Sequence, residues 1–158
     1  MKKLLTLVAA LTLSASAFAE VTVDQPYARL VPPGQPNSAA FMTLKNNSNE
    51  EVSLVSAASS VAKVVELHTH IHDNGVMKMR QVPKITLQPN GEVALKPGGL
   101  HIMLIGLEHN LAKDEMIDLT LNFSDGSSEQ LDIPVMDVMA GMSNMKMHHD
   151  MKKDMPDQ

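Results

Sequence analysis

Four side chains that can bind metals recur at fixed separations in the centre of the sequence. They are His68, Met79, His101 and Met103, in the pattern H-x10-M-x21-H-x-M. Imidazole nitrogen is an intermediate ligand and thioether sulfur is a soft one. A set containing both, with no thiolate and no required carboxylate, suits Cu(I) better than Zn²⁺, Ca²⁺ or Mg²⁺. The residue types therefore indicate a site for monovalent copper.

Three more metal-capable side chains, His70, His72 and Met77, lie close to this pattern along the chain. They could tune the four-residue site or hold a second ion, including Cu(II). Each residue also has an ordinary structural explanation. The histidines could form a solvated strand face, and Met77, Met79 and Met103 could fill gaps in a core. Core packing does not require a histidine two residues before Met103, so the combined pattern favours a metal site.

The Asn-Gly pair at residues 74–75 predicts how these residues are brought together. Asn-Gly readily takes the two positive φ angles of a type I′ turn, so a two-residue hairpin is expected. Its strands would pair in one register: Asp73 with Val76, His72 with Met77, and His70 with Met79. Because strand side chains alternate between faces, His68 would lie one diagonal step from Met79 on the same face. His101 and Met103 would likewise share one face of another strand.

The chain up to residue 135 consists of short apolar or alternating runs separated by turn residues, which is typical of antiparallel strands. No stretch in it has a convincing 3.6-residue period. Eight or nine strands at this spacing predict an all-β fold, either a β-sandwich or a small Greek-key barrel. The expected strands cover residues 21–23 with 27–31, 38–45, 52–57, 63–72, 76–82, 93–95, 101–107, 116–123 and 129–135.

The composition limits what can stabilise this fold. The chain has no cysteine, so disulfide bonds and the thiolate of a blue-copper site are both excluded. With one Tyr, three Phe and no Trp, the core must consist mainly of Val, Leu, Ile and Ala. Met42 and Met116 are expected to belong to this core. His109 has no partner at ligand spacing and is expected to be an exposed histidine.

Residues 1–19 have the pattern of a secretory signal peptide. Lys2 and Lys3 form a basic start, residues 4–13 an apolar run, and residues 17–19 a small-residue cleavage site. The apolar run is shorter than the roughly twenty residues that span a membrane. We therefore expect cleavage, export to the periplasm and no membrane span afterwards. Without Lys2 and Lys3, eleven basic residues oppose eighteen acidic ones and the formal charge changes from −5 to −7. Such an acidic chain predicts no nucleic-acid partner.

One mature domain, residues 20–135, is expected, followed by a Met/His-rich segment, residues 136–158, which is expected to be a flexible tail. This segment holds seven of the thirteen methionines. Methionines in steps of three drift by about 60° per step on a helix of 3.6 residues per turn, which argues against a helix with one methionine face. Met147, His148 and His149 are the candidate ligands here, and they could capture copper or close over the main site. A disordered tail without a metal role is the alternative.

The motif and the residues around it resemble a known family, the periplasmic copper chaperones called PCuAC. The similarity includes Glu66-Leu67-His68, Gly75-Val76-Met77-Lys78-Met79-Arg80, and Lys96-Pro97-Gly98-Gly99 followed by His101-Ile102-Met103-Leu104. It covers most of the mature chain, from about residue 21 to residue 135. The resemblance implies a cupredoxin-like Greek-key sandwich whose Cu(I) site is formed by His68, Met79, His101 and Met103.

The resemblance also implies a function, namely holding Cu(I) and passing it to a copper-accepting protein of the periplasm or membrane. The recipient would be a cytochrome c oxidase subunit, at its binuclear copper A centre, or another copper chaperone. Copper buffering or resistance is an alternative within the binding class, and a copper redox enzyme is a third hypothesis. Thioether-rich coordination stabilises Cu(I), and no acid/base pair stands out in the sequence, so we expect a protein that is not an enzyme. We also expect it to be a monomer.

Overall fold

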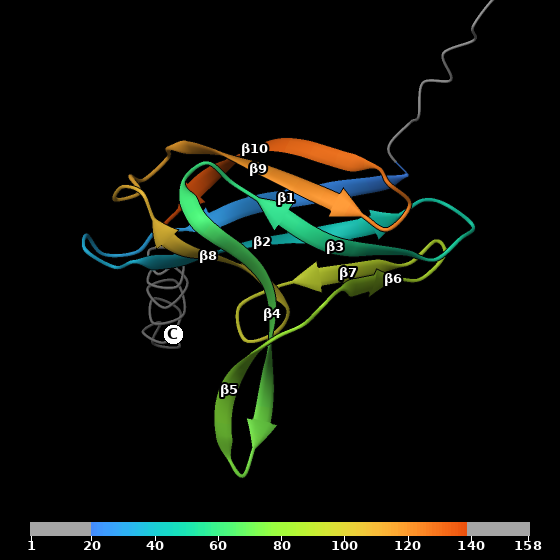
Figure 1. Cartoon of the computed structure of the whole chain (residues 1–158), viewed down its shortest axis with the longest axis horizontal. Helices are drawn as coiled ribbons and strands as arrows, with labels where there is room; N and C mark the ends of the chain where they lie inside the picture. Colours follow the sequence, from blue (N-terminus) through green and yellow to red (C-terminus); the bar gives the residue numbers. More distant parts are fainter. Residues whose placement is uncertain (1–19, 139–158) are drawn as a thin grey trace, which may run out of the picture.

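The computed structural model describes residues 20–138, which form ten β-strands (Figure 1). In chain order they are β1 Val21–Arg29, β2 Asn37–Asn46, β3 Val52–Ala58, β4 Ala62–Asp73, β5 Val76–Gln81, β6 Ile85–Leu87, β7 Glu92–Leu95, β8 His101–Leu107, β9 Met116–Phe123 and β10 Ser128–Met136. The sequence predicted all of these except β6. That strand has three residues between Pro83 and Pro89, too few for alternation to be recognised from the sequence alone.

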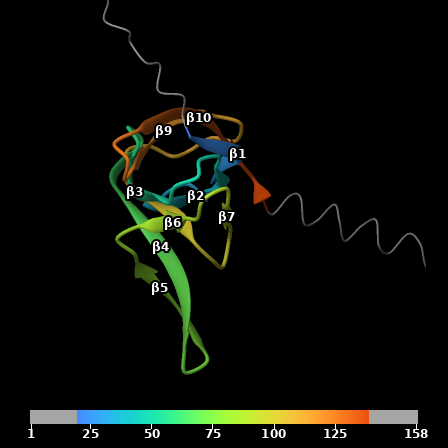
Figure 2. The ribbon, with the colours of Figure 1, turned by 90° about the vertical axis from the view of Figure 1, so that its right-hand side faces the viewer.

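The strands form two layers that share β10. One layer has the order β5-β4-β8-β2-β1, with β7 also paired to β2, and the other has the order β10-β9-β3-β6. Most of β10 pairs antiparallel with β9, whereas Val135 and Met136 pair with β1 in parallel. This is the predicted all-β sandwich, and Figures 1 and 2 show β9 and β10 on the opposite side of the body from β7, which belongs to the first layer.

The hydrophobic core fills the space between the layers. On β8, Ile102 and Leu104 are completely buried, as expected for alternate residues of a central strand that face the core. Aliphatic side chains from β2, β3, β9 and β10 pack against them. The residues that alternate with them on β8, including His101 and Met103, therefore face the outer side of the first layer.

The two methionines expected in the core differ. Met42, within β2, is buried, which confirms the prediction. Met116 is 57% exposed, so the prediction for it was wrong. Met116 is the first residue of β9, and the alternation along that strand sends Ile117 and Leu119 inward, which leaves Met116 outside.

β1 continues past Pro26 instead of ending there. A register shift between Asp24 and Tyr27, with Gln25 at a φ of 49°, accommodates the proline as a β-bulge. After the bulge, Tyr27 pairs with Phe41 of β2. Arg29, two residues further on, consequently lies on the same outer face as Tyr27.

The end of β4 and the whole of β5 form a hairpin that projects from the sandwich (Figures 1 and 2). Its turn residues Asn74 and Gly75 have φ angles of 51° and 79°, which confirms the predicted type I′ geometry. The predicted register is confirmed as well: Asp73 pairs with Val76, His72 with Met77, and His70 with Met79. Every residue of β5 is exposed.

Asn46 is a buried polar side chain that joins the end of β2 to the chain around β6. Its Nδ2 donates to the carbonyl oxygens of Glu50, Leu87 and Gln88 at 2.7, 3.3 and 3.2 Å. Its Oδ1 accepts hydrogen bonds from the backbone N–H and the hydroxyl of Ser48 at 3.0 and 2.9 Å. The side chain thus bonds to two segments, residues 48–50 after β2 and residues 87–88 at the end of β6.

Replacing Asn46 with Ala should lower the free energy of unfolding by about 2–3 kcal/mol, because it removes the side-chain hydrogen bonds of a buried residue, including the buried one to Leu87. Urea denaturation followed by circular dichroism would measure the loss. Asn47→Ala is the matched control, because Asn47 is exposed and makes one side-chain hydrogen bond, to Thr22. Equal effects of the two substitutions would contradict the structural role of Asn46.

Two predicted segments lie outside the described residues: the signal peptide, residues 1–19, and nearly all of the Met/His-rich tail. Within residues 20–138, no helix has the length and apolar character needed to cross a membrane.

Candidate metal centre

The candidate ligands gather on the outer face of the first layer, opposite the core. Residue pairing sets this arrangement: His68 of β4 pairs with His101 of β8, and Ala39 of β2 pairs with Met103. Because Ala39 is small, it leaves open space beside the Met103 side chain. The hairpin then places Met79 next to His70, on the same face.

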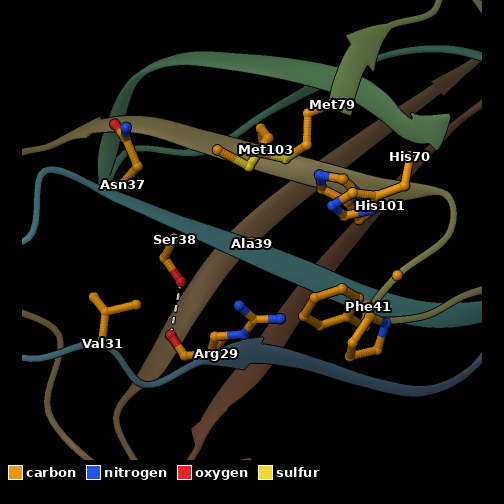
Figure 3. Close-up of a pocket in the computed structure, with 12 residues that line it drawn as sticks. Arg29, Val31, Asn37, Ser38, Ala39, Phe41, His70, Met79, His101 and Met103 are labelled. Carbon is orange, nitrogen blue, oxygen red and sulfur yellow. Dashed lines mark hydrogen bonds between the residues drawn. The ribbon is translucent and has the colours of Figure 1, made fainter. Parts of the chain in front are cut away.

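A pocket of about 200 Å³ opens on this face (Figure 3). Three of the four motif residues line it, namely Met79, His101 and Met103. His70 also lines it, whereas His68 does not. The other lining residues are Arg29, Val31, Asn37, Ser38, Ala39, Phe41, Pro97 and Gly98.

His101 is the most firmly held of the imidazoles. Its side chain is buried, with the ring centroids of His68, His70 and Phe41 at 5.8, 5.2 and 6.3 Å. Its Nδ1 lies 2.9 Å from the carbonyl oxygen of Gly99, which can only accept a hydrogen bond. The proton is therefore on Nδ1, and Nε2 keeps its lone pair for a metal, an arrangement common among metal-binding histidines.

The loop between β7 and β8 supplies this carbonyl. Lys96 donates from its backbone N–H to Leu100, and Gly99 donates back to Lys96, so the loop is a closed turn. Gly98 within it has a φ of 84°, a backbone conformation that favours glycine. The turn thereby fixes the Gly99 carbonyl beside His101.

The pKa of His101 is lowered from the ordinary histidine value of 6.5, chiefly because burial disfavours the charged ring. The hydrogen bond to Gly99 opposes this effect, and positive charge at His70, His68 and Arg29 adds to it. His101 is consequently neutral at pH 7, as a metal ligand must be.

This lowered pKa predicts how the stability of the metal-free protein depends on pH. The unfolded chain takes up the His101 proton near pH 6.5, and the folded chain takes it up only at lower pH. Stability should therefore fall as pH drops below about 6.5. His101→Leu should lose less stability than the wild type between pH 7 and pH 5.5 in urea titrations. Parallel losses in the two proteins would show that His101 does not contribute.

His68 is held by a residue that the sequence analysis did not single out. Its Nε2 lies 2.8 Å from a carboxylate oxygen of Glu66, two residues earlier on the same face of β4. With the Nε2 proton donated to Glu66, Nδ1 carries the lone pair. That Nδ1 is buried and has no hydrogen-bond partner. An orphaned buried acceptor fits a copper ligand, with Glu66 acting as the outer carboxylate that orients the ring.

The methionines of the hairpin are not core residues. Met79 is 53% exposed and Met77 is 47% exposed, so the alternative of ordinary core packing is wrong for both. Met79 nevertheless lines the pocket. Met103 is half-buried and lines the same pocket. The two thioethers therefore approach one cavity from different strands (Figure 3).

The remaining candidates are not part of this pocket. His72 and Met77 are exposed near the tip of the hairpin, two pairs away from His70 and Met79. His109 is exposed, as predicted, and its Nε2 is 2.7 Å from Glu115. The tail candidates Met147, His148 and His149 lie outside the described residues.

A metal at this site would need sulfur ligands. Among residues 20–138, no three side chains of His, Cys, Asp or Glu are placed to hold a metal ion together. The pocket instead combines imidazole nitrogen with two thioethers, and no carboxylate lines it. This donor set fits Cu(I) and does not fit Ca²⁺, Mg²⁺ or a structural zinc ion.

Arg29 and Phe41 also line the pocket and were missed in the sequence. The guanidinium carbon of Arg29 lies 5.2 Å from the centre of the Phe41 ring, in the range of a cation–π contact. The sequence feature that could have identified Arg29 and Phe41 is the alternation of side chains along β1 and β2. This alternation can be interpreted only once the bulge in β1 and the pairing of the two strands are known.

Comparison with known proteins identifies the family. A family model described as "Putative lipoprotein LpqE-like" matches residues 21–135. The chain is 37% identical over 114 residues to the "Putative lipoprotein Lxx21020" of Leifsonia xyli subsp. xyli, which covers 72% of this chain and 69% of that protein. It is 33% identical over 100 residues to "Uncharacterized protein RP573" of Rickettsia prowazekii, covering 63% of this chain and 55% of that protein.

Solved structures have the same fold. The solution structure of CuI-DR1885 from Deinococcus radiodurans superimposes with a TM-score of 0.64 at 31% identity, covering 80% of this chain and 85% of that chain. The copper-bound PCuAC domain from PmoF2 gives a TM-score of 0.64 at 20% identity, covering 77% and 96%, which is a likeness of fold alone. The resemblance stated from the motif is thus confirmed: the fold is the cupredoxin-like β-sandwich of PCuAC domains, and the chain belongs to the LpqE-like family.

Proposed function

We propose that this protein binds one Cu(I) ion in the outer-face pocket and passes it to another copper protein. The observation that carries the proposal is the donor set, in which Met79, Met103 and a neutral His101 line one small cavity. His68 does not line the pocket, but its ring centroid lies 5.8 Å from that of His101 and its buried Nδ1 has no partner, so it is the fourth ligand in this proposal. The similar protein CuI-DR1885, by its name, holds Cu(I), which supports the same cargo here.

The ligands suit a carrier because they are neutral and one of them is accessible. Met79 is half exposed on the projecting hairpin, so an acceptor can reach it. Thioethers are moderate ligands, and an acceptor with thiolates can replace them by ligand exchange. Copper delivery requires such exchange, whereas a redox enzyme would also require a substrate site.

The sequence and the family support a proposal for the site of action, and the recipient is a further part of that proposal. The signal-like residues 1–19 and the lipoprotein description of the family support export, and delivery would then occur in the periplasm. The recipient we propose is a cytochrome c oxidase subunit during assembly of its copper A centre. A soluble domain of that subunit, mixed with the Cu(I)-loaded protein, should acquire copper, and the absence of transfer would contradict delivery.

Copper stoichiometry separates delivery from buffering, for which the methionines after residue 135 would add capacity. We expect one tight Cu(I) site in an anaerobic titration against a competing chelator, and weaker additional binding through Met147, His148 and His149. Deleting residues 139–158 should leave the tight site and reduce total capacity. Several tight sites in the full chain would favour a buffering protein, and loss of the tight site on truncation would mean that the tail contributes to it.

A further inference from the structure

Arg29 places an unpaired positive charge on the wall of the proposed copper pocket. It is the last residue of β1, and its guanidinium points toward Phe41 and His101 in Figure 3. Its Nε is buried and has no hydrogen-bond partner. None of the ion pairs within residues 20–138 includes Arg29. Leaving a buried N–H donor without a hydrogen bond costs free energy, and binding of an acceptor would remove this cost.

The pocket offers no anion to balance this charge. All of its twelve lining residues are neutral or basic, with no Asp or Glu among them. Binding of Cu(I) by His and Met adds a further positive charge, because these ligands are neutral. Two cations would then share a partly enclosed cavity of about 200 Å³, where their repulsion is stronger than in water. One monovalent anion between them would remove both the repulsion and the unpaired donor.

We propose that the Arg29 side of the pocket is a subsite for one soft anionic donor, a thiolate or a halide, that binds the copper ion and the guanidinium together. The proposal rests on the proposed Cu(I) function. The anion is expected to be a soft donor because Cu(I) prefers sulfur or a heavy halide to oxygen donors. The guanidinium supplies fixed hydrogen-bond donors and a permanent positive charge.

The subsite gives copper transfer a defined first step. A thiol of the acceptor loses its proton to solvent, and the thiolate sulfur donates an electron pair to Cu(I) beside Arg29. The bond between copper and Met79 then breaks, and Met79 keeps its electron pair. Copper remains monovalent throughout, so no oxidant or reductant is required. Met79 is the ligand that leaves because it is the most exposed of the lining ligands.

The test uses bromide as the probe of the Cu(I)-loaded full chain, with perchlorate at the same ionic strength as the reference. X-ray absorption at the copper edge should show a bromine neighbour in the wild type. The bromide affinity should fall on the order of tenfold in Arg29→Gln, as expected for loss of a hydrogen bond to a charged group. In perchlorate, Arg29→Gln should bind Cu(I) more tightly than the wild type, because a neighbouring positive charge is removed. Arg29→Lys should retain most of the bromide affinity.

Arg80→Gln is the matched control, because Arg80 is exposed on β5 and does not line the pocket. It should leave bromide binding unchanged. If the copper of the wild type has no bromine neighbour, the proposal is wrong, and this result does not depend on whether Arg29→Gln folds. A bromide affinity in Arg29→Gln equal to that of the wild type would also overturn the proposal. Loss of Cu(I) loading in the wild type itself would instead contradict the proposed function.

A second arm separates the two sources of the anion. Copper transfer to a peptide with one cysteine should slow on the order of tenfold in Arg29→Gln relative to the wild type and to Arg80→Gln, again as expected for loss of one hydrogen bond to a charged group. If bromide binding depends on Arg29 but transfer to the peptide does not, the subsite holds a free halide and the thiolate source is wrong.

Discussion

Replacing both Met79 and Met103 with alanine should lower the Cu(I) affinity by more than about 100-fold, beyond the roughly 10–100-fold that outer partners of a ligand contribute. The two thioethers are the soft donors that distinguish this pocket from an ordinary histidine cluster. Without them the remaining imidazoles retain some affinity but lose the preference for Cu(I) over Cu(II). Competition with a Cu(I) chelator under anaerobic conditions would measure the change.

The fold should survive this double substitution. Met79 is 53% exposed on a strand whose residues are all exposed, and Met103 lies on the outer face of β8, away from Ile102 and Leu104. The matched control is Met77→Ala combined with Met116→Ala, which removes two exposed thioethers that do not line the pocket. That control should retain Cu(I) affinity. Unchanged affinity in the Met79/Met103 variant would remove both residues from the site.

The sequence predicted the hairpin well because local chemistry determines it. A type I′ turn requires positive φ angles, which Asn74 and Gly75 readily adopt. A two-residue turn at this point then leaves one register for β4 and β5. Nine of the ten strands were predicted for a similar reason, since turn residues bound each run. The short β6 was missed because three residues between two prolines carry too little pattern. Met116 was misplaced because hydrophobicity alone does not show which face the first residue of a strand occupies.

The pocket itself was harder to predict, because strands distant in sequence form it. The bulge at Gln25 sets which face Arg29 occupies, and nothing in the residues around Arg29 shows that β1 lies beside β2 at this point. The choice between His68 and His70 is similar. Both share one face of β4, and only the folded arrangement of the segments around them shows that His70, not His68, lines the cavity. The spacing of residues in the sequence predicts which side chains share a face of a strand, whereas tertiary packing determines which of them are enclosed in a pocket.

Removing the imidazole of His101 should have the largest effect of any single substitution at the site. His101 lies next to both His68 and His70, at ring-centroid distances of 5.8 and 5.2 Å, so it can share a metal ion with either of them. Its Nε2 lone pair is fixed by the hydrogen bond from Nδ1 to Gly99, and its lowered pKa keeps it neutral. His101→Leu fills the same buried space with an apolar side chain and removes the ligand.

We expect His101→Leu to lower the Cu(I) affinity by at least about 100-fold, the upper range for outer partners alone, while the protein remains folded at pH 7. His109→Leu is the control, because His109 is exposed and paired with Glu115 away from the pocket. Chelator competition should show the loss in the first variant and not in the second. Circular dichroism should show the same β-sheet signal in both, since the introduced leucine would pack beside Phe41 without a polar group to bury. Wild-type affinity in His101→Leu would mean that copper binds elsewhere in the protein. The pocket between β8 and the hairpin would then bind a different ion or molecule.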